Sequence, residues 1–202
     1  MQIIDLILNI SIVVLAMISF LYYQLPSSNK YYIGLSILRY FTMDSNILVA
    51  LSSLVIIPYN IINIKKKSLY LPPLLSLLKY VGTVSVMLTF LTVIIFLGPT
   101  QGFDIMYVNV SLFMHLVTPI LALLSFVLTE KNNLDERVTI TSIIPMTIYG
   151  IIYTTNVVYK NRWTDFYGFN INGNWRITFL IMLISTYLIG LLVYFLPKII
   201  KN

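Results

Sequence analysis

Two residues that are far apart in the sequence, Thr42 and His115, have the side chains that nucleophilic catalysis needs. A threonine hydroxyl is a weak nucleophile until a base accepts its proton, and neutral imidazole is the usual base near pH 7. Both residues lie in apolar stretches, and His115 is the single histidine of the chain. If the two side chains meet, they would suit acyl transfer on a lipid ester.

Several other polar residues are candidates for binding the substrate or supporting this pair. An amide or a phenol would stabilise the oxyanion, for which Asn46, Asn156 and Tyr153 are the candidates. Arg39 would bind a carboxylate or phosphate of the lipid head. The remaining supporting candidates are Asp44, Ser45, Ser111 and Thr118.

The segment that begins at residue 39 places most of its polar side chains on one face of a helix. At roughly 100° per residue, one arc of about 120° contains Arg39, Thr42, Ser45, Asn46, Val49 and Ser53. Asp44 points to the other side. In hydrocarbon an unpartnered polar group costs several kcal/mol, so this face is expected to meet the protein interior or a wet cavity. His115 is the leading candidate for its partner.

Each of these residues also has a structural interpretation. Threonine in a membrane helix usually hydrogen-bonds its own backbone, and structural histidines are common. Asp44 would then pair with Arg39 or with a lipid head group, and Lys79 is expected to snorkel to the cytoplasmic surface. The aromatic residues of segment 161–174 are typical of an interfacial belt, with a lid or collar over a site as the alternative.

The composition indicates an integral membrane protein. Of the 202 residues, 58% are hydrophobic and 10% are charged, whereas a soluble domain carries about 25% charged residues. The net charge of +6 suits flanks that lie against anionic lipid, and no basic cluster exceeds Lys65, Lys66 and Lys67, so no nucleic-acid partner is expected. With no cysteine and one histidine, the sequence predicts no disulfide, metal or cofactor.

Six apolar runs, each near the ~20 residues that a bilayer requires, predict an all-α polytopic membrane protein with six transmembrane helices. The predicted helices are residues 3–23, 38–61, 74–97, 106–128, 140–158 and 177–196. Short connections indicate a single domain over residues 1–202. Basic residues number seven on one side and five on the other, which predicts that both termini are cytoplasmic.

Two short motifs resemble a known group. Residues 41–49 (F-T-M-D-S-N-I-L-V), followed by residues 115–119 (H-L-V-T-P), resemble the Pr6Pr group of bacterial six-helix membrane proteins. They are also similar, more distantly, to the family of the androgen-induced protein and the androgen-dependent TFPI-regulating protein. That family comprises membrane hydrolases of fatty acid esters of hydroxy fatty acids, with a threonine nucleophile and a later histidine.

The resemblance implies that Thr42 is the nucleophile, that His115 is its partner and that the substrate is a lipid ester. The sequence Asp44-Ser45-Asn46 after the threonine departs from the animal members. The richness in Ile, Asn, Lys and Tyr is typical of a bacterium with an AT-rich genome, which predicts the bacterial cytoplasmic membrane as the location. The sequence leaves the oligomeric state open.

Two other functions stay open at the level of sequence. A small transporter or channel would use the polar face of the second helix and would depend on Asp44 or Lys79 rather than on Thr42. A non-catalytic structural membrane protein would tolerate substitution of both Thr42 and His115.

Overall fold

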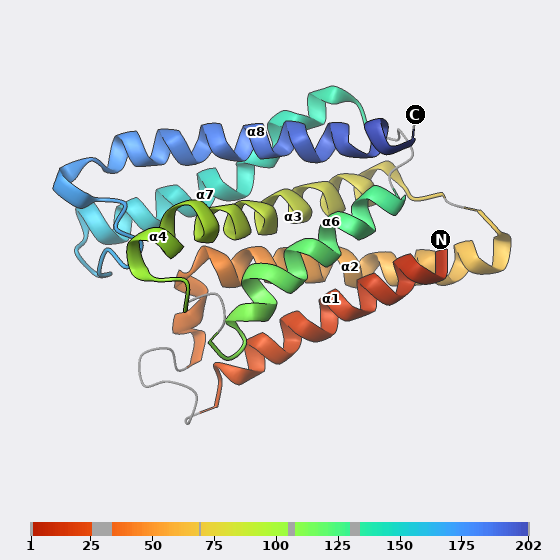
Figure 1. Cartoon of the computed structure of the whole chain (residues 1–202), viewed down its shortest axis with the longest axis horizontal. Helices are drawn as coiled ribbons and strands as arrows, with labels where there is room; N and C mark the ends of the chain where they lie inside the picture. Colours follow the sequence, from red (N-terminus) through yellow and green to blue (C-terminus); the bar gives the residue numbers. More distant parts are fainter. Residues whose placement is uncertain (1, 26–33, 69, 105–107, 130–133, 202) are drawn as a thin grey trace.

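The computed structural model describes residues 2–25, 34–68, 70–104, 108–129 and 134–201. Lys30, Met106 and Lys131, which entered the predictions of helix bounds and orientation, lie outside these ranges. Within the described ranges the regular structure is helical throughout, with no strand, which confirms the all-α prediction. Figure 1 shows the long helices arranged side by side as one bundle.

The helices alternate in direction, so that the start of the first and the end of the last lie at the same end of the bundle (Figure 1). The long elements are α1 (Gln2–Tyr22), α2 (Phe41–Lys66), α3 (Pro73–Thr92), α6 (Thr118–Thr129), α7 (Ile143–Thr154) and α8 (Trp175–Lys201). Shorter helical segments join or extend them: η1 (Gly34–Arg39), η2 (Val93–Leu97), α4 (Gly98–Gln101), η3 (Phe113–Val117), η4 (Glu136–Ser142), η5 (Thr155–Tyr159) and η6 (Ile171–Gly173).

Five helical stretches are long and apolar enough to cross a membrane: Gln2–Tyr22, Phe41–Lys66, Pro73–Gln101, Glu136–Tyr159 and Trp175–Ile200. Among the described residues, the fourth predicted helix, residues 106–128, begins only after Val110. Its apolar part is Phe113–Thr129, which spans roughly 25 Å against the ~30 Å of a hydrocarbon core. The reason is local, because Asn109 has a left-handed backbone with φ of 53° and the turn around it delays the helix.

The second helix also begins later than predicted. Arg39 closes the 3₁₀ segment η1, and Tyr40 precedes α2 with an extended backbone (φ −102°, ψ 124°). Arg39 is therefore not part of the polar face of α2. The rest of that face is as expected, because Ser45, Asn46 and Ser53 are buried.

Three wide π-helical segments interrupt the helices near the end of the bundle that lies away from the chain termini. They are Val93–Leu97, Phe113–Val117 and Thr155–Tyr159. Such turns shift the following side chains around the helix axis and frequently occur at functional sites. His115 lies in the middle of the second one.

Two kinds of packing fill the interior. One layer takes a buried residue from each of four helices, namely Ile12 of α1, Val49 of α2, Val86 of α3 and Ala122 of α6. Gly82 allows α3 to approach α2 closely, since a Cβ at this position would lie 3.0 Å from the Cα of Val49. The apolar side chains of this layer fill the space between the four helices.

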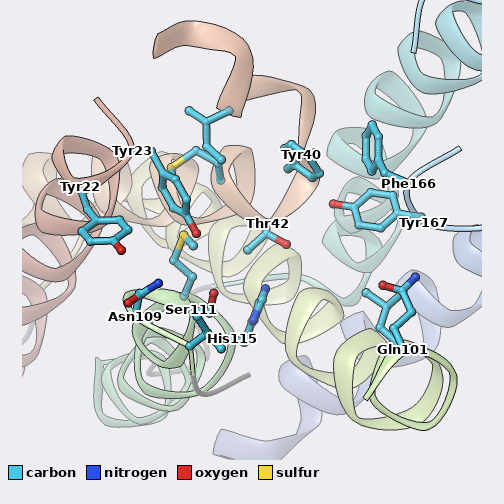
Figure 2. Close-up of a pocket in the computed structure, with 15 residues that line it drawn as sticks. Tyr22, Tyr23, Tyr40, Thr42, Gln101, Asn109, Ser111, His115, Phe166 and Tyr167 are labelled. Atoms are coloured by element: carbon cyan, nitrogen blue, oxygen red, sulfur yellow. The ribbon is translucent and has the colours of Figure 1, made fainter. Parts of the chain in front are cut away.

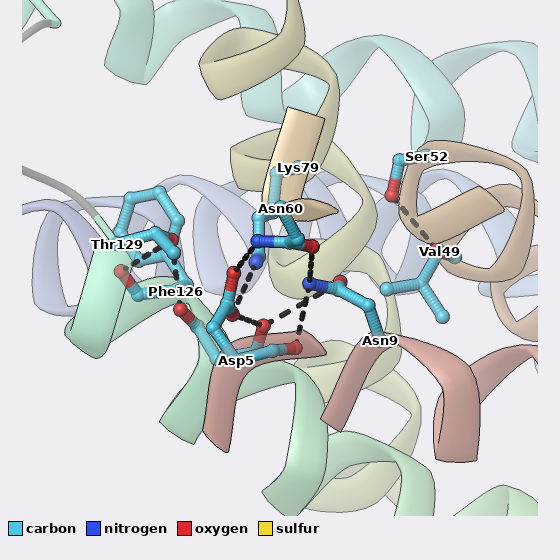
Figure 3. A network of polar contacts seen from close by, with 9 residues as sticks. Asp5, Asn9, Val49, Ser52, Asn60, Lys79, Phe126 and Thr129 are labelled. Atoms are coloured by element: carbon cyan, nitrogen blue, oxygen red, sulfur yellow. Dashed lines mark hydrogen bonds and ion pairs between the residues drawn. The ribbon is translucent and has the colours of Figure 1, made fainter. Parts of the chain in front are cut away.

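A buried ion pair joins the same four helices nearer to the chain termini. Lys79 Nζ of α3 lies 3.0 Å from Asp5 Oδ1 of α1, and both side chains are 2% exposed. Asn60 of α2 donates to Asp5 Oδ2 at 2.6 Å, and the Ser125 hydroxyl of α6 donates to Asp5 Oδ1. Figure 3 shows this network around Asp5, with Asn9 also bonded to Asn60. The prediction that Lys79 snorkels to the surface is wrong, because its charge has a partner inside the bundle.

Candidate active site

A cavity of about 330 Å³ lies at the end of the bundle away from the chain termini. Thr42 from the first turn of α2 and His115 from η3 both line it. Its other lining residues come from the end of α1, η1, the start of α2, the η2–α4 segment, residues 108–114 and the loop before α8: Tyr22, Tyr23, Ile37, Tyr40, Met43, Leu97, Gln101, Val108, Asn109, Ser111, Met114, Phe166 and Tyr167.

Thr42 and His115 lie near one another in the middle of this group, with Ser111 one helical turn before His115 (Figure 2). The late starts of the two helices explain why the two residues line the same cavity. Thr42 is one residue beyond the start of α2, and His115 is two residues into η3, so both side chains are at the same end of the bundle. The arrangement places a hydroxyl and an imidazole at one cavity, as nucleophilic catalysis requires.

Asn46 fixes the two backbones that carry these side chains. Its Nδ2 donates to the carbonyl of Thr42 at 2.8 Å and to the carbonyl of Met114 at 3.2 Å. Met114 directly precedes His115, so one buried amide bridges both candidate catalytic segments. Asn46 itself does not line the cavity, and its structural role is positioning rather than oxyanion binding.

Tyr167 brings a phenol to the start of α2, beside Thr42 (Figure 2). Burial raises the pKa of the Tyr167 hydroxyl to about 12, although hydrogen bonding with Thr42 and with the backbone of Phe41 opposes part of that rise. The phenol is therefore protonated near neutral pH and able to donate a hydrogen bond. The first turn of a helix also has N–H groups without intrahelical acceptors, and these favour negative charge.

The loop that carries Tyr167 is shaped by an acidic residue. Asp165 accepts hydrogen bonds from the Tyr153 hydroxyl at 2.7 Å and from the backbone N–H groups of Phe169 and Asn170, both at 2.8 Å. Tyr153 in turn accepts the N–H of Tyr167 at 3.3 Å. Tyr153 therefore positions the loop, and it is not among the lining residues of the cavity.

The remaining predicted site residues lie away from the cavity. Asn156 donates to the carbonyl of Ile152 in its own helix at 2.8 Å. Ser45 lies 3.0 Å from the hydroxyl of Thr89, inside the bundle. Thr118 is buried, and its hydroxyl has no hydrogen-bond partner among the described residues.

The two charged candidates, Arg39 and Asp44, are also outside the cavity. Arg39 Nε donates to the carbonyl of Ser36 at 3.0 Å, and the carbonyl of Arg39 accepts the Tyr149 hydroxyl at 2.9 Å. Asp44 lines a second cavity on the other side of α2, in agreement with its predicted direction. The structure therefore brings Thr42, Ser111 and His115 together and separates them from both charges.

Sequence reasoning missed most of the polar groups that line the cavity: Tyr22, Tyr23, Tyr40, Gln101, Asn109 and Tyr167. The tyrosines follow or precede apolar runs, and tyrosines at such positions are usually interpreted as an interfacial belt. The one available signal was the aromatic segment 161–174, which was expected as either a belt or a lid. Its Phe166 and Tyr167 rings pack against the Tyr40 ring, with centroids at 4.3 Å and 6.2 Å, beside the cavity.

Comparison with known proteins gives no relative for this chain. No family model, no curated protein and no solved structure matches it.

Proposed function

We propose that this protein is a membrane hydrolase of lipid esters, with Thr42 as the nucleophile and His115 as the general base. The observation that carries the proposal is that a hydroxyl from α2 and the single imidazole of the chain line one cavity among apolar helices. The resemblance of residues 41–49 and 115–119 to membrane threonine hydrolases supports the same two roles. The cavity volume falls within the range of roughly 300–1,000 Å³ that is usual for small-molecule sites.

The proposed reaction has two steps with balanced proton transfers. The Thr42 oxygen attacks the ester carbonyl carbon while the His115 imidazole accepts the hydroxyl proton. The imidazolium then returns this proton to the leaving alcohol as the ester bond breaks, which leaves an acyl-threonine. Water attacks the acyl-threonine with His115 again as the base, and the carboxylic acid leaves as the Thr42 hydroxyl reforms.

We assign oxyanion stabilisation to Tyr167 and the first turn of α2. A protonated phenol donates a hydrogen bond to developing negative charge, and the positive end of the helix adds to this effect. This assignment replaces Asn156 and Tyr153, whose side chains are bonded elsewhere.

The proposed orientation has both termini in the cytoplasm, in a bacterial cytoplasmic membrane. At the terminal end of the bundle lie Lys65 and Lys66 at the end of α2, Arg137 in η4 and Lys198 near the end of α8. Basic residues near membrane segments are more frequent on the cytoplasmic side. The catalytic cavity would then open towards the outer leaflet.

Hydrolysis by the reconstituted protein tests this proposal. Vesicles that contain wild-type protein are expected to cleave fluorogenic lipid esters above the rate of protein-free vesicles. His115→Ala is expected to lower kcat/KM by about 10²- to 10⁴-fold, the usual contribution of a general base. Equal rates for wild-type protein and His115→Ala, with identical elution profiles, would refute the assigned base.

Transport is the second candidate function, and the buried Asp5–Lys79 pair favours it. Ionisable residues inside a membrane bundle commonly mark ion or substrate pathways. A transporter would keep its flux in Thr42→Ala, whereas a hydrolase would lose its activity in that variant. Thr42→Ala therefore separates the two functions, and Lys79→Met does not, because it is also expected to destabilise the fold.

A further inference from the structure

A second cavity, of about 270 Å³, forms a groove between α2 and α7. The two helices pack mainly on other partners, α2 on α1 and α3, and α7 on α8 and η4. The groove walls are apolar, with Phe41 and Leu48 on one side and Pro145 and Ile148 on the other. Ile148 is 55% exposed, so the wall continues onto the outer surface of the bundle, where lipid chains would lie.

Asp44 is the single charged residue among the described residues that line this groove. Its side chain is half-buried, and within the described ranges it has no hydrogen-bond or ion-pair partner. The hydroxyl of its polar neighbour Ser45 already has a hydrogen-bond partner, because it donates to the carbonyl of Thr42 at 3.0 Å. A carboxylate in an apolar setting is costly unless a cation pairs with it, so the groove favours a ligand that brings a positive charge.

Two residues that line the groove are next to arginines in the sequence. Arg39 follows Leu38, and Arg162, which is exposed, precedes Trp163; Leu38 and Trp163 both line the groove. Trp163 also belongs to the aromatic loop at this end of the bundle, a position typical of residues at the lipid head-group level. The groove is thus apolar with one carboxylate in its lining, and Arg39 and Arg162, which do not line it, each follow or precede a lining residue in the sequence.

We propose that this groove binds one phospholipid with an ethanolamine head group. An acyl chain lies along the apolar walls, the ammonium group pairs with Asp44, and the phosphate faces Arg39 and Arg162. A primary ammonium can donate hydrogen bonds to the carboxylate, which a choline head group cannot do. A glycerol head group carries no positive charge, so it would leave Asp44 facing the negative phosphate alone. This site is independent of the proposed hydrolase activity.

Trp163 provides the measurement, because it lines the groove and the chain has only two tryptophans. In a Trp175→Phe background, the protein is reconstituted in phosphatidylcholine bilayers that contain an equal fraction of brominated phosphatidylethanolamine or brominated phosphatidylglycerol. Quenching of Trp163 is expected to show about two- to fivefold tighter association of the ethanolamine lipid, the size of effect that one partly exposed ion pair supplies.

Asp44→Asn is expected to abolish this preference and to leave folding unchanged, because the Asp44 side chain makes no hydrogen bond or ion pair within the described residues. The matched control is Asp104→Asn, which removes an exposed carboxylate that does not line the groove and should keep the preference. Equal quenching by both lipids in the wild type, or a preference that persists in Asp44→Asn, overturns the proposal. Native mass spectrometry of the wild-type protein is a second test of the proposal. Retention of only anionic lipid on the protein would also overturn the proposal.

Discussion

Thr42→Ala is expected to lower lipid-ester hydrolysis by at least about 10³-fold, because the substitution removes the only atom proposed to form the acyl intermediate. Loss of the nucleophile in a serine hydrolase costs about 10⁶-fold in kcat, and a residual rate of about 10³- to 10⁴-fold over water comes from the oxyanion site and binding. The measurement is the steady-state rate of reconstituted protein on a fluorogenic lipid ester, with protein amount fixed by absorbance.

Two further variants separate chemistry from packing in this experiment. Thr42→Ser keeps the hydroxyl and is expected to retain a large part of the rate. Thr100→Ala removes an exposed hydroxyl that, among the described residues, bonds only to carbonyls of its own helical stretch, the closer being Phe96 at 2.7 Å, and should be neutral. If Thr42→Ala retains the wild-type rate, Thr42 is not the nucleophile.

Lys79→Met is expected to lower the free energy of unfolding by about 3–5 kcal/mol, the usual cost of leaving one member of a buried ion pair alone. The Asp5 side chain is 2% exposed and would keep the hydrogen bonds from Asn60 and Ser125 without any neutralising charge. The measurement is unfolding of the purified protein in mixed micelles, followed by circular dichroism as denaturant is added.

The double variant Asp5→Asn with Lys79→Met is expected to be more stable than Lys79→Met alone, because removal of both charges leaves none buried and unpaired. Ser52→Ala is the matched control. Ser52 is also buried, but among the described residues its hydroxyl bonds only to the carbonyl of Val49 in its own helix, at 2.8 Å, and its loss should cost far less (Figure 3). Equal losses in Lys79→Met and Ser52→Ala would contradict the structural role of the ion pair.

The sequence allowed prediction of features that depend on local periodicity. The polar face of α2 follows from the spacing of Ser45, Asn46 and Ser53, and the opposite direction of Asp44 follows from the same 3.6-residue repeat. The lengths of the apolar runs likewise predicted the five helical stretches that are long enough to cross a membrane, whereas the sixth is shorter. The proximity of Thr42 and His115 was inferred because both residues were expected at similar depths below the outer ends of their helices. That inference required an assumed topology.

Features that depend on contacts between distant segments were not predictable in this way. Lys79 looked like a snorkelling lysine because its partner Asp5 comes from α1 and the supporting Asn60 from α2. The short fourth helix depends on the left-handed backbone of Asn109, and an asparagine adopts that conformation only in some contexts. The approach of Tyr167 to Thr42 depends on hydrogen bonds to Asp165 that shape an irregular loop.

The most direct test of the central claim is labelling of the purified protein with a fluorophosphonate probe, followed by peptide mass spectrometry. The probe reacts with hydroxyl groups that a neighbouring base activates. We predict one adduct, on the peptide that contains Thr42, in the wild-type protein and its loss in both Thr42→Ala and His115→Ala. An adduct on another residue, undiminished labelling in either variant, or no adduct on well-folded wild-type protein would contradict the activated-threonine mechanism.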